Sequence, residues 1–167
     1  HDNGMHGVPD AEDYIYTMSF SEKPDDLGQW RGYTMPGNGY CIVFNKAKII
    51  EYLGQYRHKC CLVKCFYESN EKNKWFEWTL NNLNTLLPNS SIYGHLDGKL
   101  SLPTKVKILL SAMKHECFSN EHEWRLICPT VDLCDVKCRE HGGAIKSYYH
   151  MDFPVDVVEG IIVGPDV

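Results

Sequence analysis

Tyr14-Ile15-Tyr16-Thr17-Met18-Ser19-Phe20 is the first stretch of the chain that predicts regular structure. It is rich in aromatic and β-branched residues and contains neither Gly nor Pro, so it predicts a β-strand that is buried on both faces. Residues 21–26 follow with cap-forming side chains, Pro24 and two acidic residues, which are typical of the first turn of a helix. We therefore expect a strand and then a short helix over residues 25–33.

Farther along the chain, apolar patterns predict strands that alternate with helices. Expected strands cover residues 40–44, 60–67, 123–128, 145–150 and 157–163, the last with the near-continuous apolar character of a buried strand. Expected helices follow the N-cap Asn45, cover residues 70–87, and begin at Pro103 with an apolar face of Val106, Leu109, Leu110 and Met113. The prediction is one α+β domain over residues 1–167, with a central, mostly antiparallel mixed sheet and several helices inserted between its strands.

The composition is that of a folded domain. Among 167 residues there are 17 Lys and Arg against 22 Asp and Glu, a net charge of −5, and 43% hydrophobic residues. No apolar run reaches the roughly 18 residues of a membrane span, and no signal segment begins the chain, so we expect a cytoplasmic protein without membrane contact. The mildly acidic net charge and the absence of a Lys/Arg block argue against non-specific nucleic-acid binding. A small basic surface on an acidic chain would not be revealed by the net charge.

Eight cysteines leave three interpretations open. An even number in a small chain is compatible with disulfides, and Cys134, Cys138 and His141, with His115 or Cys117, could form a zinc site. Most of the cysteines lie in apolar or strand-like stretches, where a thiol behaves as a small hydrophobic group. We favour reduced thiols and expect no metal.

Two short polar pairs accompany predicted strands. Ser19-x-Ser21 lies at the end of the first strand, and Glu121-x-Glu123 lies at the start of the strand over residues 123–128. Because residues two apart on a strand point to the same face, each pair can present two polar groups to one cleft. Two hydroxyls and two carboxylates suit cleavage of a glycosidic bond, in which a carboxylate stabilises positive charge that develops on a sugar ring.

A purely structural interpretation competes with this hypothesis. Glu121 and Glu123 would be edge-strand carboxylates paired with Arg125 or Lys114, and Ser21 would cap the following helix.

The neighbouring aromatic and histidine residues are equally open to two interpretations. Trp30, Tyr33 and Tyr40 could stack on a planar ring, or they could belong to the core. His115 and His122 bracket the glutamates and could take part in acid–base chemistry, or they could be ordinary surface residues.

Two blocks of sequence resemble the bacterial family known as domain of unknown function 2971. The resemblance is carried by residues 16–22, then Asp25, Asp26, Leu27, Trp30, Tyr33, Gly37, Gly39, Phe44 and Asn45, and in the second half by Lys114, Phe118, residues 121–127, Tyr148, Tyr149 and residues 161–165. Members of that family usually have a further N-terminal strand and helix. Because the chain begins at His1 on a polar stretch, we expect it to lack that portion.

The plan of this family is similar to that of ADP-ribosyltransferases. The resemblance implies that Ser19 and Ser21 support the nicotinamide ribose of NAD, that Glu123 binds the ribose 2′-hydroxyl, and that Glu121 orients the acceptor. The first-strand Arg or His of those enzymes would lie upstream of Tyr14, where His6 is the available substitute.

The resulting expectation is an NAD-consuming ADP-ribosyltransferase or NAD glycohydrolase, of the kind that acts as a toxin or in anti-phage defence. Its catalytic residues would be Glu123 and Glu121, and Ser19, Ser21, Trp30 and Tyr33 would bind NAD. The acceptor would be a protein, a nucleic acid or water. The alternatives are a non-catalytic module that binds a nucleotide or a protein, and a metal-dependent nuclease.

Overall fold

The structure is a computed structural model, and it describes residues 14–34, 39–55, 60–81, 92–94, 102–129, 134 and 136–165. Its elements are, in chain order, β1 (Tyr16–Ser21), α1 (Leu27–Tyr33), β2 (Tyr40–Phe44), α2 (Lys46–Gln55), β3 (Cys61–Lys64), α3 (Ser69–Asn81), β4 (Ile92–Gly94), α4 (Leu102–Ser111), a 3-10 helix (Glu116–Glu121), β5 (Glu123–Cys128), β6 (Val136–His141), β7 (Ala144–Tyr149), a 3-10 helix (Val155–Val157) and β8 (Val158–Val163). All pairings between these strands are antiparallel. The expected α+β class is confirmed.

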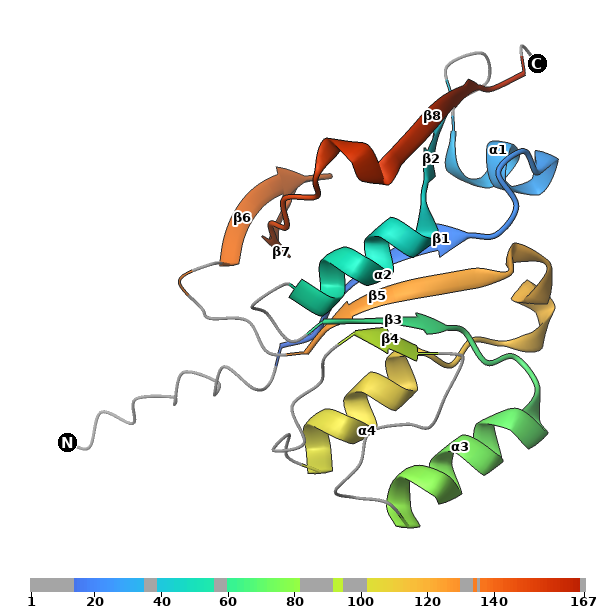
Figure 1. Ribbon diagram of the computed structural model, residues 1–167, viewed down its shortest axis with the longest axis vertical. Coiled ribbons are helices and arrows are strands. Elements are labelled where there is room, and N and C mark those ends of the chain that lie inside the picture. Colours follow the sequence, from blue (N-terminus) through green and yellow to red (C-terminus); the bar gives the residue numbers. More distant parts are fainter. Residues whose placement is uncertain are drawn as a thin grey trace.

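A four-stranded sheet in the order β1-β5-β3-β4 is the centre of the fold. Helix α2 covers one face of this sheet, and α3 and α4 cover the other (Figure 1). Because alternate residues of a strand point to opposite faces, β3 and β5 supply side chains to a separate core on each side. The cluster beside α2 is Ile49, Leu53, Cys60, Leu62, Trp124, Leu126, Cys128 and Val157, and the opposite cluster is Cys61, Val63, Phe66, Ile108, Ala112 and Ile127.

Two smaller sheets complete the described fold. Strand β2 pairs with β8, and β6 pairs with β7. Figure 1 shows the β2–β8 pair rising away from the central sheet beside α1, and the β6–β7 pair on the opposite side of α2. Residues of β1, α1, β2 and α2 line a cavity, and this cavity is part of the candidate site.

Burial of two apolar strands differs from the sequence-based prediction. Strand β1 is mostly exposed, because it is the edge strand of the central sheet and not an inner strand. Among the described strands, β8 pairs with β2 alone, and Ile161 and Val163 are 65% and 70% exposed. An apolar run reveals that a strand forms but not how many neighbours cover it.

The buried face of α4 also differs from the expected one. Of the expected residues Leu109 is buried and Leu110 is 57% exposed, and Thr104 and Ile108, which were not expected, are buried at the four-residue spacing of a helix face. Strands β4 and β6 lie in stretches for which no strand was predicted. The expected end of the helix over residues 70–87 lies partly outside the described residues, since α3 is described to Asn81.

Candidate functional site

The pairing of β1 with β5 brings the serine and glutamate pairs together. Ser19 lies opposite Arg125 and Ser21 opposite Glu123 in the antiparallel register. The Ser21 hydroxyl donates a 2.8 Å hydrogen bond to the backbone carbonyl of Glu121, which ties the segment before β5 to the sheet edge. The two serines and the two glutamates, which come from distant parts of the sequence, therefore lie close together in the fold.

The glutamate pair is not arranged as two strand residues. Glu121 ends the 3-10 helix Glu116–Glu121, and only Glu123 belongs to β5. Between them His122 adopts a left-handed conformation with φ of 45°. The strand spacing that predicted a shared face is thus wrong in detail, although both carboxylates still contact one cation, Lys114.

Glu123 is 4% exposed, and charged neighbours occupy both of its carboxylate oxygens. Arg125 donates from Nε to Oε1 at 2.7 Å and from Nη2 to Oε2 at 3.2 Å, and Lys114 Nζ donates to Oε2 at 2.7 Å. The Glu123 backbone N–H donates to the Tyr67 hydroxyl at 2.9 Å. Burial raises the pKa of Glu123, but hydrogen bonds from Arg125, Lys114 and Ser19 outweigh it and lower the pKa to about 2.

Lys114 and Arg125 hold the carboxylates in place from the α4 side of the sheet. Lys114 Nζ lies 2.5 Å from Glu121 Oε2, and Arg125 Nη1 donates to the Ser111 carbonyl at 2.6 Å. Burial lowers the pKa of Lys114, yet the two carboxylates raise it overall. The structural alternative named these ion pairs correctly, but β5 is an inner strand of the sheet and not an edge strand.

Two cavities that share lining residues lie beside β1, and the smaller one adjoins this cluster. The smaller has a volume of about 230 Å³ and is lined by Ser19, Phe20, Ser21, Gln29, Tyr33, Glu121 and Glu123. The larger, of about 590 Å³, lies between β1, α1, β2 and the first turns of α2, and it shares Ser19, Phe20, Ser21, Gln29 and Tyr33 with the smaller one. The combined space is within the range of sites that hold small molecules, roughly 300 to 1,000 Å³.

A second charged group lies at the wall of the larger cavity. The Trp124 indole N–H donates to Glu22 Oε1 at 2.7 Å, and Lys64 Nζ lies 3.1 Å from the same oxygen. Lys46 Nζ lies 3.4 Å from the centroid of a Trp124 ring. Burial and the neighbouring Lys64 lower the pKa of Lys46, although Glu22 opposes them. The sequence patterns did not indicate Glu22, Lys46 or Trp124 as site residues.

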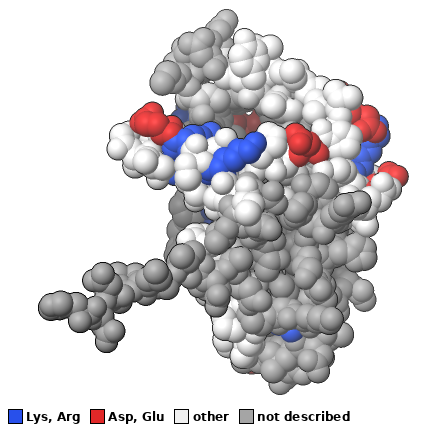
Figure 2. All heavy atoms as spheres, turned by 90° about the vertical axis from the view of Figure 1, so that its left-hand side faces the viewer, with Lys and Arg blue, Asp and Glu red and all other residues white. Residues whose placement is uncertain are grey.

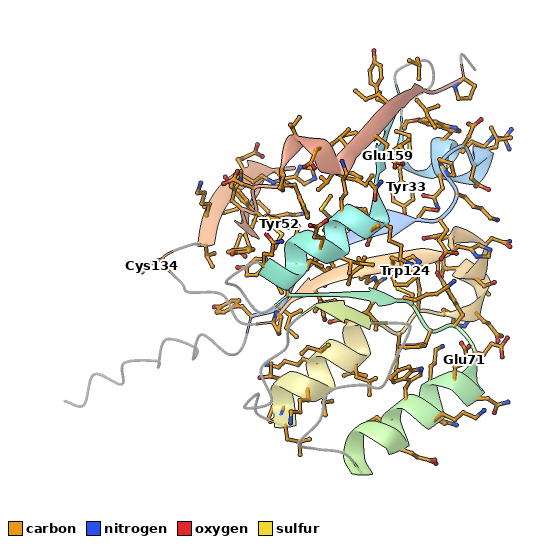
Figure 3. All side chains as sticks on the ribbon, in the orientation of Figure 1. Tyr33, Tyr52, Glu71, Trp124, Cys134 and Glu159 are labelled. Carbon is orange, nitrogen blue, oxygen red and sulfur yellow. The ribbon has the colours of Figure 1, made fainter. Side chains whose placement is uncertain are left out.

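Trp30 and Tyr33 occupy different environments on α1. Trp30 is 7% exposed, and its indole N–H donates to Asp25 Oδ1 at 2.8 Å. Tyr33 is 72% exposed and lines both cavities. Figure 3 shows Tyr33 above Trp124, on the side where α1 and the β2–β8 pair lie. The structural interpretation of Trp30 as a core residue therefore matches its burial, whereas Tyr33 is available to a ligand.

Other interpretations of the sequence find no support among the described residues. There, no group of three His, Cys, Asp or Glu side chains could hold a metal ion, and no helix is long and apolar enough to cross a membrane. Cys138 and His141 are three residues apart on β6 and point to opposite faces. None of the eight cysteines forms a disulfide. His6, the expected substitute for a first-strand cation, lies outside the described residues.

The fold and the site define an α+β protein with a cavity between an edge strand of the central sheet and a separate two-stranded sheet. The model of the family described as "Protein of unknown function (DUF2971)" matches residues 29–126, and the chain belongs to this family. The match includes Trp30, Tyr33, Lys114, Glu121 and Glu123. No curated protein and no solved structure matches the chain significantly.

Proposed function

We propose that this domain binds NAD in the two cavities beside β1 and cleaves its nicotinamide–ribose bond, as an ADP-ribosyltransferase or NAD glycohydrolase. The bond from ribose C1′ to the nicotinamide nitrogen breaks, and its electron pair leaves with nicotinamide, which loses the positive charge of its ring. C1′ then bonds to the oxygen of water or to an acceptor nucleophile, which gives up a proton. A bacterial toxin or anti-phage protein of the cytoplasm would use this reaction to consume NAD.

The convergence of Ser19, Ser21, Glu121 and Glu123 at the smaller cavity carries this proposal. With a pKa of about 2, Glu123 is ionised at neutral pH, as stabilisation of an oxocarbenium-like ribose requires. Glu121 is the more accessible of the two carboxylates, its side chain being 21% exposed against 5% for Glu123. Tyr33 and the apolar wall formed by β2 suit stacking of a planar ring.

The proposal is tested by nicotinamide release from NAD. Wild-type protein, Glu123→Gln and Glu121→Gln are incubated with NAD, and free nicotinamide is measured by chromatography. We expect turnover by the wild type and a loss of at least about 100-fold in the Glu123 variant, because the charge that stabilises the transition state is removed. Urea unfolding of each variant separates lost chemistry from lost folding. Absence of turnover by the wild type, or equal rates in folded Glu123→Gln, contradicts the proposal.

One observation favours a second function, a non-catalytic sensor that binds a nucleotide or a protein. Both Glu123 oxygens are already engaged by Arg125 and Lys114, so the carboxylate is built into an electrically balanced cluster. A sensor would bind NAD or another nucleotide saturably without turnover. Calorimetric titration with NAD and with ATP, in parallel with the nicotinamide assay, distinguishes the two functions. Tyr33→Ala would weaken binding in either case, while Glu121→Gln would leave binding to a sensor nearly unchanged.

A further inference from the structure

The β6–β7 ribbon, residues 136–149, has one basic face. The register places Lys137 opposite Tyr148 and Arg139 opposite Lys146. Because cross-strand partners and residues two apart share a face, these four side chains lie on the same side of the ribbon. The ribbon contains three basic residues and one acidic residue, in a chain whose net charge is −5.

The ribbon is anchored to the core at one end, by two residues of the face opposite the basic one. Val136 and Tyr149 are partners in the register, and both contact the core cluster beside α2. The Tyr149 ring centroid lies 6.3 Å from that of Tyr16. Lys137, Arg139 and Lys146 lie on the face that does not contact this cluster, and all three are exposed.

The basic face has no nearby acidic residue from the ribbon itself. Glu140 points to the other face and accepts a 2.7 Å hydrogen bond from the Gly143 backbone N–H in the turn. Figure 2 views the side of the molecule that carries the ribbon and shows Lys and Arg side chains close together, with Asp or Glu side chains to either side of them. Directly opposed cations such as Arg139 and Lys146 repel each other, which lowers the stability of the hairpin unless an anion lies between them.

An aromatic ring accompanies the cations. Tyr148 is half-buried, and the Arg139 guanidinium carbon lies 5.7 Å from its ring centroid. Cations that contact phosphates, together with a ring on which a base can stack, are the combination that binds single-stranded nucleic acid. None of the ribbon residues lines either cavity in the part of the chain that the structure describes, so this surface is separate from the proposed NAD site.

We propose that the basic face of the β6–β7 ribbon, formed by Lys137, Arg139, Lys146 and Tyr148, binds the backbone of single-stranded nucleic acid. The ribbon supplies about three phosphate contacts and one stacking contact, so binding is weak, salt-dependent and independent of base sequence. The overall acidity of the chain confines this binding to the ribbon, because the remaining surface repels phosphates.

The proposal is tested with fluorescein-labelled 12-mers of dT and of U, by fluorescence anisotropy with the full chain in about 50 mM NaCl. The ribbon variant is Lys137→Gln with Arg139→Gln and Lys146→Gln. Its matched control, Arg31→Gln with Lys48→Gln and Lys74→Gln, removes the same charge from other exposed positions. We expect a wild-type Kd of about 10⁻⁴ to 10⁻⁶ M, a loss of about tenfold or more in the ribbon variant and less than about twofold in the control.

Salt dependence and competitors give the outcomes that decide the proposal. The logarithm of the association constant decreases linearly with the logarithm of the salt concentration. Loss of three phosphate contacts should make this slope less steep by about 2 in the ribbon variant. Tyr148→Leu should weaken binding several-fold without changing that slope. The proposal is overturned by absence of wild-type binding, by equal losses in the two triple variants, by equally effective competition from poly-glutamate, or by binding only to phosphatidylserine vesicles. Should the triple variant fail to fold, Arg139→Gln and Lys146→Gln are measured singly against the same criteria.

Discussion

Ser21 lies directly opposite Glu123 in the antiparallel register of β1 and β5. Its hydroxyl donates to the carbonyl of Glu121, so the edge strand holds the last residue of the 3-10 helix that precedes β5. The position of the two carboxylates therefore depends on β1 as well as on Lys114. A site assembled in this way responds to changes at the sheet edge and at the ion pairs.

Removal of the Glu123 charge should lower stability in a pH-dependent manner. The pKa of about 2 in the folded protein lies below the ordinary value of 4.5, so the unfolded chain takes up the proton first as the pH falls. The stabilisation is therefore complete above about pH 5 and is lost as the pH falls toward 2. We expect Glu123→Gln to cost about 3 kcal/mol at pH 7 and clearly less at pH 3, by urea unfolding.

A control variant tests whether this pH-dependent loss of stability is specific to the buried carboxylate of Glu123. Glu71→Gln on the exposed first turn of α3 should change stability by no more than about 0.5 kcal/mol at either pH. If Glu123→Gln costs the same at pH 7 and pH 3, the lowered pKa is not the source of the stabilisation.

Asn45 should contribute to stability through both ends of its side-chain amide. Its Oδ1 accepts from the Lys48 backbone N–H at 3.0 Å, as an N-cap does, and its Nδ2 donates to Glu159 Oε1 at 2.6 Å. We expect Asn45→Ala to cost about 1 to 2 kcal/mol in urea unfolding and Asn45→Ser to cost less, because Ser retains the cap. Equal costs for the two variants would show that the cap itself contributes nothing.

The parts of the fold that follow from short-range patterns were predicted, and Asn45 is an example. Its cap, the helix after it and the strand at Glu123 depend on neighbours within a few residues in the chain. The exposure of β8 was not predicted, because Ile161 would look the same in the sequence whether one strand or two flanked it. An apolar run specifies a strand, but the sheet order that decides its burial is a tertiary property.

The candidate site was likewise predicted only in part. The family resemblance implied that Ser19, Ser21 and Glu123 lie at one site, and the register of β1 and β5 brings these residues together. The structural alternative named Lys114 as a partner of the carboxylates, but no pattern indicated that Trp124 would orient Glu22 at the larger cavity. These contacts join residues from separate elements, so no local period signals them.

The hydroxyl of Tyr16 should be dispensable. It is buried and has no hydrogen-bond partner among the residues that the structure describes, whereas the Tyr52 hydroxyl donates to the Asp152 carbonyl at 2.7 Å. A buried polar group without a partner is costly, so Tyr16→Phe should leave stability unchanged or raise it by about 1 kcal/mol. Tyr52→Phe serves as the comparison and should lower stability by about 1 kcal/mol. Thermal and urea unfolding of both variants measure the difference, and a large loss in Tyr16→Phe would contradict the burial of an unsatisfied hydroxyl.

Trp30 and Tyr33 should separate folding from ligand binding, although both lie on α1. Trp30 is buried, its indole N–H is bonded to Asp25 and it lines the larger cavity, so Trp30→Phe, which keeps an aromatic ring there, should cost about 1 to 2 kcal/mol of stability and weaken NAD binding less than Tyr33→Ala. Tyr33 is exposed at the mouth of both cavities, so Tyr33→Ala should change stability by less than about 0.5 kcal/mol. The same substitution should weaken binding of NAD several-fold in calorimetric titration, because a stacking surface is lost. The reverse result, with Tyr33→Ala unfolding the protein and Trp30→Phe abolishing binding in a folded protein, would assign ligand contact to the buried ring and refute the proposed role of Tyr33.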